Sequence, residues 1–183
     1  MSDLRTLLDE HAIHIVSVFL VVAAWIDGKE LRVPNKLTYP FIAAGLVVMT
    51  VAGGWTGLGM SLLGASVGMM CLLPLYAVGG MGSGDVKMMM GMGAWLGAQI
   101  TWDAFYVSVI VGAVMALIMI AATGRWRHHW NNAVMIVGEL FRVRNPWLVS
   151  EAAAERKPNM ALLPYGIPIC IGSIGYFISA GLM

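Results

Sequence analysis

Two aspartates stand out because each directly borders a long apolar run. Asp27 ends the run that begins near residue 12, and Asp85 precedes the run that continues to about residue 100. Acidic side chains beside a membrane core are costly and are functional candidates by default. Two carboxyl groups about 3 Å apart share one proton, so one can activate a water while the other protonates a carbonyl or leaving group. Together the two residues predict the chemistry of an aspartic protease, with no metal and no cofactor.

Taken singly, each aspartate also has a structural explanation. An aspartate at a helix N-terminus caps the helix, and Gly-Ser-Gly-Asp (82–85) is an ordinary turn sequence. Asp27 is followed by Gly28 and could simply end a helix. On the functional interpretation, Gly82 and Gly84 carry no side chains and would let a substrate backbone or a partner helix approach Asp85 closely. The positions of the surrounding helices must decide between the two interpretations.

The surrounding segments are apolar enough for a membrane. Hydrophobic residues make up 59% of the 183 residues and charged residues only 11%, with a mean hydropathy of +0.79, whereas soluble domains are about 25% charged. A spanning helix needs about 20 apolar residues. We therefore expect one all-α, polytopic membrane domain over residues 1–183, with tight turns at 53–57 and 101–103. Its six transmembrane helices would lie at about 12–26, 37–52, 58–78, 86–100, 104–122 and 160–183.

The positive charges predict an orientation. Every lysine and arginine except Arg5 falls in the loops after the first, third and fifth spans, and such loops face the cytoplasm. Both termini should therefore be non-cytoplasmic, with Asp27 and Asp85 at the cytoplasmic side of a bacterial inner membrane. The long loop 124–159 has apolar residues at helical spacing, which fits either an interfacial helix or a loop helix packed on the bundle. A net charge of +1 without a basic, aromatic-interleaved cluster argues against nucleic-acid binding.

The chain resembles the type IV prepilin peptidase family, which are membrane aspartic proteases of the GxGD type. The likeness covers the whole chain and rests on three stretches in the family's order: Asp27 followed by Pro34-Asn35, Gly82-Ser83-Gly84-Asp85 with Lys87, and Pro164-Tyr165-Gly166. The resemblance implies a six-helix core that removes short basic leaders from prepilin and pseudopilin precursors at the cytoplasmic membrane face. It also implies that Asp27 and Asp85 are catalytic. The motif-supporting residues would be Gly82, Gly84, Lys87, Pro34 and Asn35.

Larger members of that family carry an N-terminal cytoplasmic insertion with two CxxC pairs, and some N-methylate the new terminus. This chain has two cysteines, Cys71 and Cys170, both within apolar runs. It therefore resembles the short form associated with tight-adherence (Flp-type) pili, and the sequence does not support methylation.

Some residues near the aspartates keep two interpretations. Lys29, Lys36 and Met88 are candidate substrate contacts, but the lysines also fit lipid headgroup contact and Met88 fits flexible apolar filler. Asn35 could cap the second span. Two Gly-x3-Gly pairs, at 64–68 and 93–97, indicate close helix packing within the bundle or between copies. The oligomeric state stays open.

A second class of function uses the same residues. In a small proton-coupled transporter, Asp27 and Asp85 would form a proton relay. Transporters usually place such acids near the bilayer midplane, whereas these two lie at the ends of their apolar runs. A transporter also has no need of Pro34-Asn35 or Lys87 at their spacing. The sequence therefore favours the peptidase.

Overall fold

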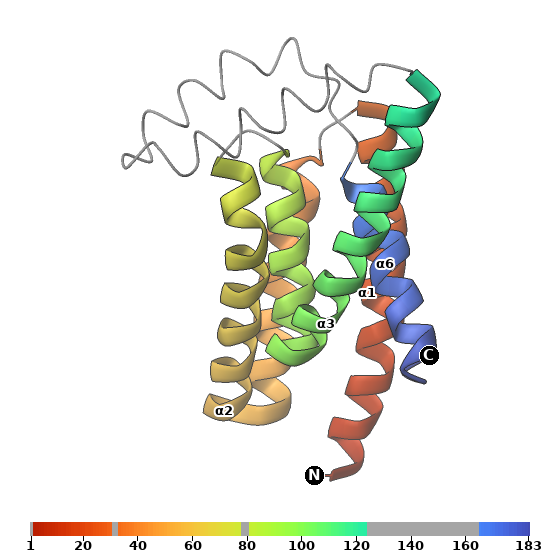
Figure 1. Ribbon diagram of the computed structural model, residues 1–183. Helices are drawn as coiled ribbons and strands as arrows, with labels where there is room; N and C mark the ends of the chain where they lie inside the picture. Colours follow the sequence, from red (N-terminus) through yellow and green to blue (C-terminus); the bar gives the residue numbers. More distant parts are fainter. Residues whose placement is uncertain (1, 31–32, 78–80, 124–164) are drawn as a thin grey trace.

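The computed structural model describes residues 2–30, 33–77, 81–123 and 165–183, with residues 2–10 described by their backbone only (Figure 1). These residues form four helices: α1 (Ser2–Glu30), α2 (Asn35–Ala77), α3 (Ser83–Thr123) and α6 (Gly166–Ser179). The prediction of an all-α fold is confirmed. The loop at 124–159, with its predicted interfacial helix, lies outside the described residues.

Helices α2 and α3 each fold back on themselves at a glycine. A straight helix of the 43 residues of α2 would be about 65 Å long, roughly twice the thickness of a bilayer core. Gly54 in α2 (φ 58°, ψ −142°) and Gly97 in α3 (φ 79°, ψ 179°) leave helical geometry, in a region that glycine enters without the steric penalty of a side chain. Figure 1 shows both helices turning back, so each supplies two neighbouring arms.

The structure corrects two details of the predicted spans. Residues 101–103 are helical and form no turn; α3 bends at Gly97 instead, and Thr101 Oγ1 donates to the Gly97 carbonyl at 2.6 Å. The bend of α2 at Gly54 falls within the turn predicted at 53–57, and the bends at Gly54 and Gly97 each join two helical arms. Helix α6 has 14 residues and is shorter than the last predicted span.

Among the described residues, three helices are long and apolar enough to cross a membrane, at His11–Glu30, Asn35–Ala77 and Ser83–Ala122, and α6 is a shorter apolar helix. Large apolar side chains point outward over much of the bundle, among them Val51, Trp55 and Ile118, which are 79%, 87% and 62% exposed. A soluble monomer rarely exposes so much apolar surface. The protein is therefore a membrane protein whose outer surface suits lipid.

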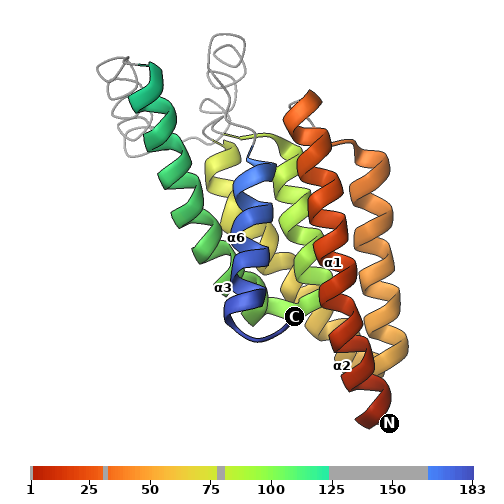
Figure 2. The same ribbon diagram turned by 90° about the vertical axis from the view of Figure 1, so that its right-hand side faces the viewer.

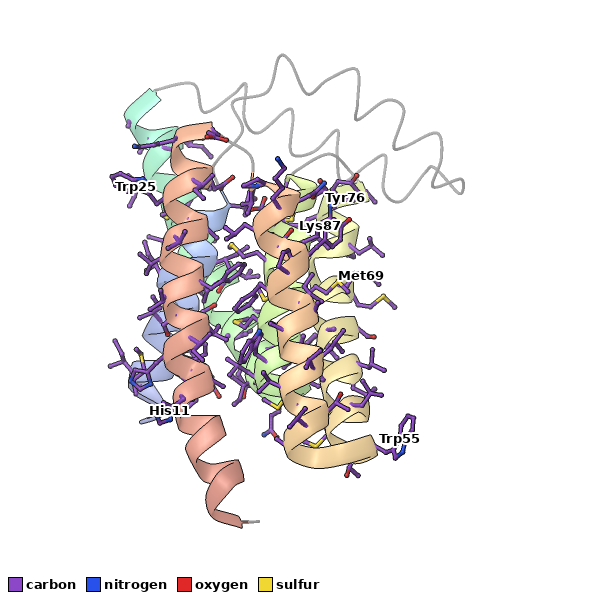
Figure 3. The ribbon with its side chains drawn as sticks, turned by 180° about the vertical axis from the view of Figure 1, so that it is seen from behind. His11, Trp25, Trp55, Met69, Tyr76 and Lys87 are labelled. Atoms are coloured by element: carbon purple, nitrogen blue, oxygen red, sulfur yellow. The ribbon has the colours of Figure 1, made fainter. Side chains whose placement is uncertain are left out.

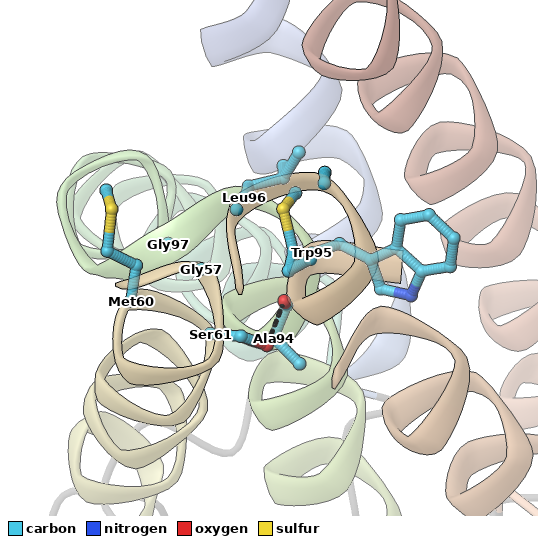
Figure 4. Close-up of a pocket in the computed structure, with 10 residues that line it drawn as sticks. Gly57, Met60, Ser61, Ala94, Trp95, Leu96 and Gly97 are labelled. Carbon is cyan, nitrogen blue, oxygen red and sulfur yellow. Dashed lines mark hydrogen bonds between the residues drawn. The ribbon is translucent and has the colours of Figure 1, made fainter. Parts of the chain in front are cut away.

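The arms of α2 and α3 touch backbone to backbone. A Cβ atom at Gly64 would collide with the Gly93 carbonyl, and one at Gly68 with the Met89 carbonyl. Ser61 Oγ donates to the Ala94 carbonyl at 2.5 Å, beside a cavity of about 160 Å³ at the bends (Figure 4). The close packing predicted from the glycine pairs is confirmed, and it occurs within one chain.

Aromatic rings fix α1, α2 and α3 against one another. Phe41 of α2 stacks on Phe19 of α1 at a centroid distance of 3.6 Å and on Trp95 of α3 at 5.5 Å. Trp95 Nε1 also donates to the Phe41 carbonyl at 2.9 Å. These contacts set the depth at which the three helices meet, and therefore the level of the residues at their ends.

The helix ends that carry the aspartates lie together. Gly84 meets Val33, just before α2, and further along α3 Trp95 lies against Gly45, so the first arms of α2 and α3 run in parallel. Figures 1 and 2 show the starts of both helices beside the end of α1, whereas the two chain termini and the bend of α2 lie toward the opposite end. The bundle thus gathers the region of Asp27 and the region of Asp85 at one end.

Candidate active site

Asp27 lies in the last turn of α1 and is 4% exposed. Its Oδ2 accepts a hydrogen bond at 2.9 Å from the backbone N–H of Gly166, the first residue of α6. N–H groups at a helix N-terminus have no partner inside the helix and favour an anion. A Cβ at Gly166 would lie 2.8 Å from Asp27 Oδ2, so only glycine fits this contact.

The sequence did not predict Gly166 as a residue of the site. The available signal was the Pro164-Tyr165-Gly166 stretch, which marks the start of the last helix. Nothing in that stretch indicates that its backbone N–H binds a carboxylate on the first helix.

Asp85 lies in the first turn of α3 and is also 4% exposed. Its Oδ2 accepts a hydrogen bond at 3.1 Å from the Gly82 N–H, which holds the carboxyl group in the Gly-Ser-Gly-Asp turn. Its Oδ1 is buried and has no hydrogen-bond partner among the described residues. A buried acceptor without a partner is costly, so this oxygen is available to a water or a substrate group.

Gly84 lets the turn approach the connection between α1 and α2. A Cβ at this position would lie 2.8 Å from the Val33 Cβ and 3.1 Å from the Val33 nitrogen. The turn that carries Asp85 therefore packs directly on the segment that follows Asp27.

The two carboxyl groups come close enough to interact electrostatically, and Asp85 also interacts with Tyr165. The site thus combines the end of α1, the start of α3 and the start of α6. Carboxyl groups that interact strongly titrate as a pair and can share one proton.

Lys87 and Asn35, two of the motif-supporting residues, bind each other. Lys87 Nζ donates to Asn35 Oδ1 at 2.7 Å and lies 4.7 Å from the centre of the Tyr39 ring. Pro34, the residue before Asn35, begins α2 by accepting backbone hydrogen bonds from Leu37 and Thr38. The contact ties the turn of Asp85 to the start of α2.

The candidate substrate contacts take different positions. Lys29 is exposed and lies over the Trp25 ring at 4.5 Å, and Lys36 is exposed. Met88 is fully buried in the main core, whereas its neighbour Met89 lines a cavity. Over the described ranges, His, Cys, Asp and Glu form no group of three or more that could hold a metal ion.

That cavity, of about 200 Å³, borders the site. Met81 and Met89 contribute to its lining from either side of Asp85 in the sequence, and Tyr165, Pro168 and Ile169 do so from the start of α6. The rest of its wall is largely apolar and comes from α2 and the second arm of α3. An extended apolar or peptide segment is the kind of group that such a space accepts.

Several known proteins are similar to this chain in sequence. The chain is 36% identical over 118 residues to the prepilin leader peptidase/N-methyltransferase of Neisseria gonorrhoeae. The aligned region covers 61% of the chain and 41% of the relative. The proteins of the same name from Aeromonas hydrophila and Bacillus subtilis are 35% and 32% identical over 105 and 108 residues, covering 54% and 56% of the chain. The match spans 36% and 42% of those two relatives.

The chain thus aligns with only about two fifths of each of these curated relatives. No solved structure matches. The profile of the Type IV leader peptidase family matches residues 14–119, which is more than half of the chain and includes both Asp27 and Asp85. The chain belongs to the Type IV leader peptidase family.

Proposed function

We propose that the protein is a membrane aspartic endopeptidase that cuts short basic leaders from prepilin-like precursors, with Asp27 and Asp85 as its catalytic pair. One observation carries the proposal. Two buried carboxyl groups from separate helices interact at one end of the bundle, and one of them keeps an oxygen without a partner among the described residues.

The proposed reaction needs only these two groups and a water. One aspartate takes a proton from the water while the water oxygen bonds to the carbonyl carbon of the scissile peptide. The other aspartate gives its proton to the leaving nitrogen as the carbon–nitrogen bond breaks. The Gly166 and Gly82 N–H groups hold one oxygen of each carboxyl group throughout.

We further propose six membrane crossings, with the catalytic end at the cytoplasmic face of the bacterial inner membrane. The bends at Gly54 and Gly97 support this, because they divide α2 and α3 into arms that with α1 and α6 make six. Figure 3 shows Trp25, Tyr76 and Lys87 toward one end of the helix bundle and Trp55 at the opposite end. Aromatic residues at both ends and cations at the catalytic end fit the usual pattern of bacterial membrane proteins.

Co-expression with a prepilin from the same genome tests the proposal. Asp27→Asn and Asp85→Asn keep the size of the side chain and remove its acid–base function, so each should abolish the shift of the precursor to the mature size. Asp103→Asn, in the second arm of α3, is the matched control and should process normally. If either active-site variant still cleaves while present in the membrane at wild-type level, the aspartic mechanism is wrong.

The proton-coupled transporter considered from the sequence is not favoured. The family match is to leader peptidases, and the two carboxyl groups lie in the last turn of α1 and the first turn of α3 rather than at mid-helix.

A further inference from the structure

Tyr165 has a fixed place beside the carboxyl pair. It immediately precedes Gly166, whose N–H binds Asp27, and its own carbonyl accepts a hydrogen bond from the Ile169 N–H at 3.1 Å. Its backbone is helical (φ −65°, ψ −19°). The residue therefore cannot move far without disturbing the Asp27 contact.

Tyr165 lies between the cavity and Asp85, because it lines the cavity and also interacts with that aspartate. It is half-buried and lines the cavity of about 200 Å³ together with Met81 and Met89. It also interacts electrostatically with Asp85. A peptide that enters this cavity to reach the aspartates would pass the tyrosine ring.

In the proposed reaction the second aspartate keeps its proton for the leaving nitrogen, so the carboxyl pair donates no proton to the carbonyl oxygen as water adds. The carbonyl oxygen gains negative charge as water adds, and a donor aimed at that oxygen stabilises the transition state. The Gly166 and Gly82 N–H groups are already bound to Asp27 and Asp85.

Two of the nearby cations make other contacts. Lys87 is bound to Asn35 and Tyr39, and Lys29 lies over Trp25. The Tyr165 hydroxyl makes no hydrogen bond within the part of the chain that the structure describes. Because a tyrosine hydroxyl ordinarily loses its proton only near pH 10, it is a donor at neutral pH.

We propose that the Tyr165 hydroxyl donates a hydrogen bond to the carbonyl oxygen of the scissile peptide and stabilises the oxyanion that forms there. This inference rests on the proposed peptidase function. The tyrosine keeps its proton throughout, since the water proton goes to one aspartate and the leaving nitrogen receives its proton from the other. Tyr165 would thus be a third catalytic residue, supplied by the segment that also orients Asp27.

Steady-state cleavage of a purified prepilin in proteoliposomes tests this role. Tyr165→Phe keeps the ring and removes only the donor. Because loss of one oxyanion donor typically lowers kcat about 10²–10³-fold, we expect a fall of at least about tenfold with KM unchanged. Tyr106→Phe is the matched control, because Tyr106 is 65% exposed on the outer surface of α3, and it should cleave like wild type.

Unchanged kcat and KM in Tyr165→Phe would overturn the inference, and so would a higher KM at unchanged kcat, which would mean ground-state binding only. Thermal unfolding of each variant in detergent identifies a kcat loss that comes from misfolding, which would also count against the proposal. Asp27→Asn and Asp85→Asn in the same assay separate the two ideas. If these are inactive while Tyr165→Phe is fully active, only the role of Tyr165 fails; if they stay active, the peptidase mechanism itself fails.

Discussion

The backbone N–H of Gly166 donates a hydrogen bond to Asp27 Oδ2 at 2.9 Å across 139 positions of sequence. This contact joins the start of the last described helix to the end of the first, and it orients a buried carboxyl group through a backbone N–H that every residue except proline carries. The fit is tight, because a Cβ at Gly166 would lie 2.8 Å from Asp27 Oδ2 and 2.9 Å from Asp27 Cβ.

Gly166→Ala should therefore impair catalysis more than folding. The new methyl group must push the carboxyl group or the start of α6 aside, and a displacement of about 1 Å at a catalytic group can cost about 10²-fold in rate. We expect leader processing to fall by about 10- to 100-fold in a quantitative time course. Gly175→Ala, on the same helix with no atom within 4 Å of the new Cβ, should process like wild type. Equal rates in the two variants would show that the Gly166 contact does not position Asp27.

Gly84→Ala should displace Asp85, the second carboxyl group of the site. Its Cβ would meet the backbone and the Cβ of Val33, which belong to a segment that cannot rotate away. The turn that carries Asp85 should move from the α1–α2 connection, and we expect processing to drop at least about tenfold with lower thermal stability in detergent. Gly59→Ala meets no atom within 4 Å and serves as the control. Wild-type stability and processing in Gly84→Ala would mean that the close approach to Val33 is unimportant.

The sequence predicts which two acids come together better than it predicts the contacts that hold them. Asp27 and Asp85 could be singled out because they border apolar runs, where an acid is costly, and the structure brings them together. The Gly166 contact could not be predicted, since a backbone N–H looks the same at every residue and its partner is set by the packing of α6 on α1.

The position of the bend in α3 also could not be predicted from the sequence. The polar residues Thr101 and Asp103 predict a turn, yet the chain bends at Gly97 and both residues are helical. Thr101 can remain in the helix because its hydroxyl donates to the Gly97 carbonyl, and Asp103 Oδ2 accepts a hydrogen bond from the Tyr176 hydroxyl of α6 at 2.9 Å. Glycine's freedom at positive φ, rather than polarity, decides where this helix turns.

The bond between Lys87 and Asn35 predicts an energetic coupling between the GSGD segment and the start of α2. In a double-mutant cycle with Asn35→Ala and Lys87→Ala, we expect the free energy of unfolding in mixed micelles to show a coupling of ~0.5–1.5 kcal/mol, the usual net value of such a bond. The cycle Thr56→Ala with Asn35→Ala measures the background, because Thr56 lies at the bend of α2 and its hydroxyl donates to the Gly53 carbonyl. A coupling of zero would mean that the 2.7 Å contact contributes nothing to stability.

Substituted cysteines test the proposed orientation. In a Cys71→Ala, Cys170→Ala background, Trp55→Cys places a thiol at the bend of α2, where the native side chain is 87% exposed. Lys36→Cys places one at the start of the same helix. A membrane-impermeant maleimide added to spheroplasts should label position 55 directly and position 36 only after lysis. The reverse pattern would invert the orientation, and labelling of both from outside would contradict a crossing between them.

Backbone contact between α2 and α3 predicts that small residues are required there for folding. Gly64 faces the Gly93 carbonyl so closely that any side chain forces the two arms apart, and forced overpacking typically costs ~1–3 kcal/mol or more. Gly64→Val should therefore reduce the folded yield in the membrane and lower the unfolding temperature in detergent. Gly59→Val, on the same arm but facing open space, carries the same loss of helix propensity without the collision, so only the difference between the two variants reports packing. If they are equally stable, the arms do not depend on this contact, and the depth at which α3 presents Asp85 must be set by the aromatic stack of Phe19, Phe41 and Trp95 instead.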